Sequence, residues 1–96
     1  IMGALCAIAL AAPHPARAQT AAPAVLAASC FSCHGPNGAS TSAMPALDKM
    51  GASVITSVLK AFRSGDAQGT VMNRIAKGYT DDEIAALGQY FSSQQR

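Results

Sequence analysis

Two cysteines and a histidine lie within five residues of one another, in the order Cys30-Phe31-Ser32-Cys33-His34. This C-x-x-C-H spacing sets the two thiols about one helical turn apart, where they can add to the two vinyl groups on one edge of a porphyrin. The histidine that follows directly then falls beneath the iron and ligates its proximal face. The motif occurs once in the sequence. It therefore predicts one covalent haem c, held by Cys30 and Cys33 and ligated by His34.

Three alternatives to haem attachment account for these three residues less well. A structural zinc site takes four ligands, whereas the chain offers only three of the usual soft type once the leader described below is removed. A thioredoxin-like redox pair needs a βαβ context, and no segment shows sustained period-two alternation. A disulfide between the two cysteines would leave His34 without a role. We therefore favour haem attachment.

The first 18 residues have the features of a secretory signal peptide. An uncharged stretch over residues 2–12 is too short to cross a membrane as a helix, and a small-x-small cleavage site follows, ending at Ala18. The sequence lacks the positively charged residues with which signal peptides begin, so we expect that a few residues precede Ile1. We expect a signal-peptide helix over residues 1–18 to be cleaved, leaving a domain over 19–96 in the periplasm with no stable membrane insertion.

The remaining domain is small and poor in large side chains. The 96-residue chain carries a net charge of +2, which is too little for nucleic-acid binding by charge alone. Half of its residues are apolar, yet it has only three Phe, two Tyr and no Trp. A domain of this size is marginal on its own core, so we expect the haem to supply part of that core. Most enzyme classes need larger pockets, and we expect no enzymatic activity of its own.

Helical patterns predict an all-α fold of about four short helices around the haem. We expect them over about 22–33, 53–64 and 70–77 and from Thr80 onward, with a loop over 35–51 that is rich in Gly, Ser and Pro. Thr80-x-x-Glu83 is a capping box for the last helix. Gly88 in that helix allows another helix to approach closely, and the Ala-rich first helix is the expected partner.

The second axial ligand is expected to be a methionine, because the mature domain has no second histidine. Met44 precedes Pro45 soon after His34, so we expect this loop on the proximal side, where a backbone carbonyl can accept the imidazole Nδ1–H. Met72 follows a whole helix and has the chain length to reach the distal face. We favour Met72; Met50 and Met44 remain alternatives, and any of the three can instead fill the core.

The order of these features resembles class I cytochrome c over nearly all of residues 22–94. The shared features are the C-x-x-C-H-G motif, Pro-Ala-Leu at 45–47, a late methionine and a capped final helix ending in Tyr-Phe. Residues 72–84, MNRIAKGYTDDEI, are similar to the cytochrome subunit of flavocytochrome c sulfide dehydrogenase. In that family the methionine of this stretch is the distal ligand, which supports Met72.

The resemblance also implies a function and a partner. It implies a periplasmic carrier of single electrons, the haem subunit that accepts them from a larger FAD-containing subunit that oxidises sulfide. Longer family members carry two haem domains, whereas this sequence has one motif. A free soluble carrier of another sulfur or respiratory pathway is the alternative. An open-site haem enzyme or sensor is a third reading, and the match around Met72 argues against it.

Four basic residues cluster around the proposed ligand Met72. Between positions 60 and 77 only Asp66 opposes them; they are Lys60, Arg63, Arg74 and Lys77. Such a positive rim would steer an acidic redox partner. An ordinary solvated helix face explains the same charges.

Overall fold

A computed structural model describes residues 3–4 and 21–94 of the chain. Its helices are, in order, α1 (Pro23–Ala28), α2 (Phe31–His34), the 3-10 turn η1 (Pro36–Gly38), α3 (Ala52–Ser64), α4 (Met72–Ala76) and α5 (Asp81–Ser93). The described residues form no strand, in agreement with the predicted all-α fold. Apart from Gly3 and Ala4, the predicted signal peptide lies outside the described residues. Within those residues, no helix has the apolar length that crossing a bilayer requires.

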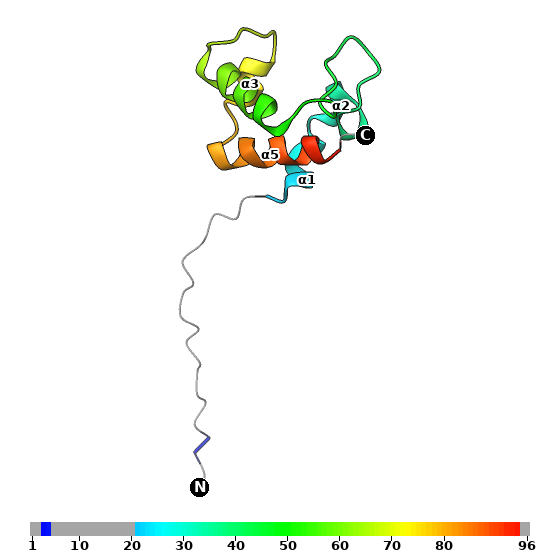
Figure 1. The fold of residues 1–96 in the computed structure, drawn as a ribbon. Coiled ribbons are helices and arrows are strands. Elements are labelled where there is room, and N and C mark those ends of the chain that lie inside the picture. The colour runs from blue at the N-terminus through cyan, green and yellow to red at the C-terminus, as the bar shows by residue number, and fades with distance from the viewer. Residues whose placement is uncertain (1–2, 5–20, 95–96) are drawn as a thin grey trace.

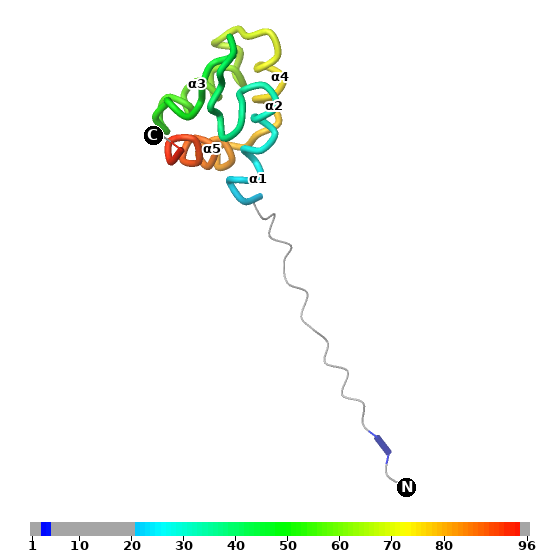
Figure 2. The backbone as a smooth tube through the Cα atoms, turned by 90° about the vertical axis from the view of Figure 1, so that its right-hand side faces the viewer, coloured from blue at the N-terminus to red at the C-terminus, as the bar shows by residue number. Residues whose placement is uncertain are grey.

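Helix α5 is the base on which the rest of the domain is built. Both α1 and α3 pack against α5, and α4 packs against α3. In Figure 1, α3 with the yellow α4 stands on one side above α5, and α2 stands on the other. Figure 2, turned by 90°, again shows α1 and α5 together at the base with α2, α3 and α4 above them.

The buried core is small. Its central cluster takes one residue each from α1 and α3 and two from α5, namely Ala27, Ile55, Leu87 and Phe91. The Phe31 ring meets the Phe91 ring edge-on, with centroids 6.4 Å apart. This contact joins the C-x-x-C-H segment to α5.

The predicted first helix, 22–33, is broken into α1 and α2 at Ser29 and Cys30. The Cys30 N–H donates to the carbonyl of Ala27, three residues back, at 2.9 Å. This bond tightens the end of α1 into a 3-10-like turn. The Ser29 hydroxyl lies 3.1 Å from the Tyr79 hydroxyl. The break therefore coincides with a contact from a distant part of the chain, which helical periodicity does not register.

The other helix signals are confirmed. Thr80 accepts a hydrogen bond from the Glu83 N–H, and the Glu83 carboxylate accepts one from the Thr80 N–H, so the capping box is complete. Gly65 ends α3 in the left-handed conformation, with φ of +89°. Gly35 ends α2 with φ of +84°, where a Cβ would lie 2.9 Å from the Ala39 carbonyl oxygen. The chain must therefore turn sharply directly after His34.

The helix that approaches Gly88 most closely is α3. A Cβ on Gly88 would lie 2.8 Å from both the Ala52 carbonyl oxygen and the Thr56 hydroxyl. The expectation that the first helix fills this place is therefore wrong. Helix α1 reaches α5 through Ala27 instead. A glycine in a helix predicts a close crossing, but the chain topology decides which helix crosses there.

Gly88→Ala is expected to destabilise the protein by about 1–3 kcal/mol, as overpacking does in well-packed sites. The added methyl group would meet a backbone oxygen, which cannot move unless α3 shifts. This cost opposes the gain in helix propensity of up to about 1 kcal/mol. Thermal unfolding of the holoprotein measures the balance, with Gln89→Ala on the exposed side of α5 as the control. Equal or higher stability of Gly88→Ala would show that the two helices separate freely.

Candidate haem site

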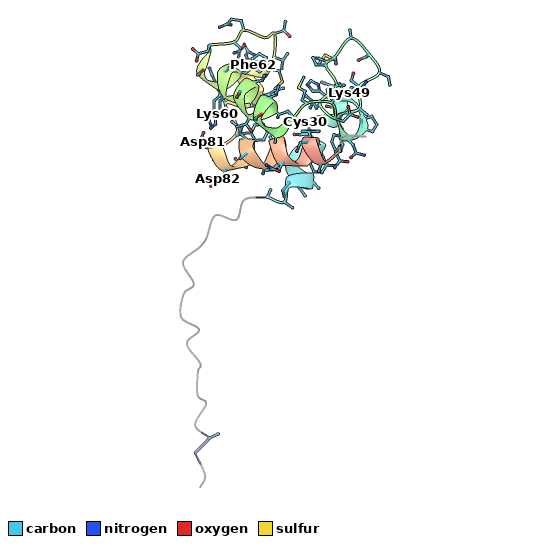
Figure 3. The ribbon with its side chains drawn as sticks, viewed as in Figure 1. Cys30, Lys49, Lys60, Phe62, Asp81 and Asp82 are labelled. Atoms are coloured by element: carbon cyan, nitrogen blue, oxygen red, sulfur yellow. The ribbon has the colours of Figure 1, made fainter. Side chains whose placement is uncertain are left out.

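The two cysteines of the motif lie on either side of the start of α2. Cys30 precedes the helix and is half-buried, whereas Cys33 lies within it and is exposed; the two do not form a disulfide with each other. Figure 3 shows Cys30 above α5, between α2 and α3. Burial raises the pKa of the Cys30 thiol, with a smaller opposing effect from its hydrogen bond to Ser29. The two cysteines thus lie on one short segment, at the start of α2 and within it.

His34 is held by the loop that contains Pro45. Its side chain is buried, with 8% exposed, and its Nδ1 lies 2.7 Å from the Pro45 carbonyl oxygen. Because a carbonyl only accepts hydrogen bonds, Nδ1 carries the proton and Nε2 keeps a free lone pair. Metal-ligating histidines are oriented in this way. The expected contact between this loop and the imidazole is confirmed.

The Pro45 loop is itself anchored to η1. The N–H groups of Leu47 and Asp48 both donate to the Gly38 carbonyl, at 2.8 and 3.3 Å. Gly38 has φ of +78°, and a Cβ there would lie 2.8 Å from the Phe91 ring. The backbone therefore runs directly over the buried core, and the carbonyl that orients His34 is fixed in place.

The three methionines occupy different environments. Met44 is 40% exposed and adjoins Pro45, on the side of the domain that holds His34. Met50 packs against the core cluster. Met72 is half-buried and begins α4, on the opposite side of the fold from α2 (Figure 1). The structure joins Cys30, Cys33 and His34 in one segment and sets Met72 on a separate element.

Asn73 and Arg63 make hydrogen bonds, not expected from the sequence, that tie α4 and the residues after it to their surroundings. The Asn73 carboxamide makes three hydrogen bonds to backbone groups between Phe62 and Gly69. The Arg63 guanidinium donates to the Tyr79 carbonyl at 3.1 Å and pairs with Asp81. These contacts span 4 to 18 positions and follow from no local sequence pattern.

Arg63 also changes the picture of the basic cluster. Its hydrogen bond and its charge hold the pKa of the Asp81 carboxyl below the ordinary value, with a smaller effect from Lys60. Figure 3 shows Lys60 and Asp81 on the same side of the domain. Arg63 is partly buried and paired with Asp81. The basic residues of the predicted rim that are exposed are Lys60, Arg74 and Lys77.

The residues present fit a haem. In the described part of the chain, no group of three or more His, Cys, Asp or Glu side chains is placed to hold a bare metal ion. One imidazole and one thioether suit an iron whose other four ligands come from a porphyrin. Large apolar side chains are exposed in pairs four residues apart, which share one helix face; they are Val54 and Val58 on α3, and Val71 and Ile75 at α4. Such surfaces suit the wide apolar faces of a haem.

Comparison with known proteins identifies the class. Residues 19–95 match the family model for cytochrome c. The chain belongs to the cytochrome c family, and it is an electron-transfer protein that carries covalently bound haem c.

Relatives narrow the comparison. The chain is 39% identical over 69 residues to the cytochrome subunit of sulfide dehydrogenase of Chlorobaculum tepidum, over 72% of this chain and 63% of that protein. It is 34% identical over 70 residues to cytochrome c-554(548) of Halomonas halodenitrificans, over 69% of this chain and 84% of that one. It is also 34% identical over 68 residues to the thiosulfate dehydrogenase electron acceptor of Stutzerimonas stutzeri, over 67% of this chain but 32% of that protein. The chain thus spans just under two thirds of the first of these relatives.

Proposed function

We propose that Cys30 and Cys33 hold the haem covalently and that His34 and Met72 ligate its iron from opposite faces. The observation that supports this best is the 2.7 Å contact between His34 Nδ1 and the Pro45 carbonyl. It leaves Nε2 as the ligating atom and makes the imidazole a stronger donor. The haem supplies a one-electron couple, and a thioether ligand in apolar surroundings favours its reduced form.

We further propose that the domain over 19–96, freed of a signal peptide over 1–18, works in the periplasm as the haem subunit for an FAD-containing sulfide dehydrogenase. The Chlorobaculum tepidum relative supports this by its name, and the stretch 72–84 supports it by its residues. The exposed Lys60, Arg74 and Lys77 would steer an acidic partner toward the Met72 side of the domain.

A free carrier is the second candidate. The match to cytochrome c-554(548) covers 84% of that protein, so a chain of nearly this size exists as a cytochrome in its own right. The Stutzerimonas stutzeri relative, named as an electron acceptor, points to another sulfur pathway. In this case the domain exchanges electrons by brief encounters and forms no lasting complex.

Covalent attachment is tested on the mature protein. Its mass is expected to exceed that of the polypeptide by one haem, and its colour is expected to survive acid–acetone extraction. Cys33→Ala should lower the yield of holoprotein sharply, because one of the two thioether bonds is lost. Ser32→Ala is the matched control, because this exposed residue lies between the cysteines and its side chain offers no thiol. Haem that extracts freely from the unaltered protein would contradict the attachment.

The partner is tested by purifying the natural protein, carrying a C-terminal tag, from separated cell fractions. A flavoprotein that co-purifies with it, and through which sulfide reduces the haem, would support the subunit. A chain that purifies alone from the periplasm and is reduced only on adding other periplasmic proteins would support the free carrier. Recovery of the haem protein from the cytoplasmic fraction alone would contradict both.

A further inference from the structure

We infer that Asn73 is a positioning residue that holds the Met72 side chain in place by tying the start of α4 to the end of α3. The inference rests on the proposed role of Met72 as an iron ligand. It adds a second residue on which that ligand depends, one that touches neither the iron nor the C-x-x-C-H motif.

The Asn73 carboxamide uses both its NH2 group and its oxygen on the end of α3 and the loop that follows it. Its Nδ2 donates to the carbonyl oxygens of Phe62 and Ala67, at 2.9 and 2.8 Å. Its Oδ1 accepts from the Gly69 N–H at 2.8 Å. The partners fix the orientation of the amide, because two carbonyls need the NH2 group and an N–H needs the oxygen. One side chain thus joins the last turn of α3, the middle of the loop and the start of α4.

Helix α4 packs against α3, but little within the helix itself holds its first turn. It has only five residues, and its N-terminus carries no side-chain cap. A helix of this length does not persist by its own hydrogen bonds. The contacts of Arg63 lie at the other end of the segment, at Tyr79 and Asp81. Asn73 is therefore the tie that acts next to Met72.

The loop also packs directly against Met72. A Cβ built on Gly69 would lie 3.1 Å from the Phe62 ring and 3.4 Å from the Met72 Cβ. Figure 3 shows Phe62 on α3, on the side of the fold that carries α4. Release of the Asn73 bonds removes a tie that joins α3, Gly69 and the start of α4, so the backbone that carries Met72 is held less firmly.

Asn73→Ala is expected to increase transient release of the sulfur from the ferric iron. Losing an ordinary hydrogen bond shifts an equilibrium by about fivefold. Losing three would multiply to about 100-fold, but bonds of one side chain are not additive, so we expect roughly 10- to 100-fold more of the open form. Imidazole, which binds the ferric iron only when the sulfur has left, reports that population through its rate of binding. Asn73→Asp, which keeps the shape but removes both donors, should accelerate imidazole binding similarly.

Asn37→Gly is the matched control. Asn37 also uses its amide in a hydrogen bond, from the Tyr90 hydroxyl at 2.9 Å, but it lies in η1. Its φ of +54° is one that glycine adopts freely. We expect this variant to bind imidazole at the rate of the unaltered protein. Equal acceleration in Asn37→Gly and Asn73→Ala, or no acceleration in either, would overturn the inference.

Met72→Ala separates this inference from the proposed ligand. If Met72→Ala abolishes the thioether-to-iron charge-transfer band and Asn73→Ala behaves as the unaltered protein does, Met72 remains the ligand and the role of Asn73 is refuted. If Met72→Ala keeps the band, both the ligand assignment and the inference are refuted. The ligand assignment and the inference are both supported if Met72→Ala loses the band and imidazole binds faster to the Asn73 variants but not to Asn37→Gly.

Discussion

Met72→Ala is expected to abolish the thioether-to-iron charge-transfer band of the ferric protein and to let carbon monoxide bind readily once the iron is reduced. An iron with both axial positions filled by strong ligands has no vacant site, and removing the thioether vacates one. The covalent and proximal attachments through Cys30, Cys33 and His34 remain, so the variant should keep its haem. Absorption spectra of both oxidation states, with and without carbon monoxide, measure the change.

The reduction potential of Met72→Ala should fall as well. A thioether raises the potential of a haem iron relative to harder ligands. Axial ligation sets haem potentials over a range of about 0.8 V, so a decrease on the order of 100 mV is expected. Redox titration of the variant beside the unaltered protein checks the direction and the size.

Met44→Ala and Met50→Ala are the matched controls, because each removes one thioether from a different place. Met44 is exposed beside Pro45 and Met50 packs on the core, so both variants should keep the band. Met50→Ala should cost stability without changing the spectrum. Loss of the band in Met50→Ala, with its retention in Met72→Ala, would move the ligand to position 50. Ready binding of carbon monoxide by the unaltered protein would mean that none of the three methionines ligates the iron.

Local signals in the sequence predicted the parts of the fold that depend on neighbouring residues. The capping box at Thr80 and the expected end of the helix near position 64 each depend on a few residues of chain, and both are present. The Pro45 loop was also predicted correctly to orient the histidine, because it follows His34 by only 11 positions. In each case the interacting groups are close in sequence, and the chain has few other ways to satisfy them.

Local sequence patterns could not predict the contacts between segments that are far apart in the chain. The close crossing at Gly88 was predicted, but its partner proved to be α3, since a small residue accepts any helix that the topology brings there. The break at Cys30 coincides with a hydrogen bond between Ser29 and a tyrosine 50 positions away. The Asn73 tie joins groups whose pairing has no periodicity, and an asparagine side chain has many local alternatives. Such residues become visible only when the backbone path is known.

Apoprotein that lacks haem is expected to be largely unfolded. Among the described residues, only Phe91 and Ile84 are large side chains that are fully buried, while Val54, Val58, Val71 and Ile75 are exposed. The longest helices have 13 residues, a length at which isolated helices are marginal in water. Conformational entropy opposes folding by about 1.5 kcal/mol per ordered residue, and this core buries too little apolar surface to offset it. The covalent haem stays on the unfolded chain, so it stabilises the fold through the apolar surface and the iron ligation that only the folded chain provides.

The test uses Cys30→Ser/Cys33→Ser, which takes up no covalent haem and forms no disulfide. Its circular dichroism should show little helix and no cooperative thermal transition, whereas Ser32→Ala holoprotein should unfold cooperatively. Adding haemin to the double variant should restore part of the helix signal, because His34 still offers its Nε2 as a ligand. His34→Ala in the same background should reduce that recovery. A cooperatively folded double variant without haemin would mean that helix packing around Phe91 and Leu87 is sufficient for folding, and that the fold does not need the haem.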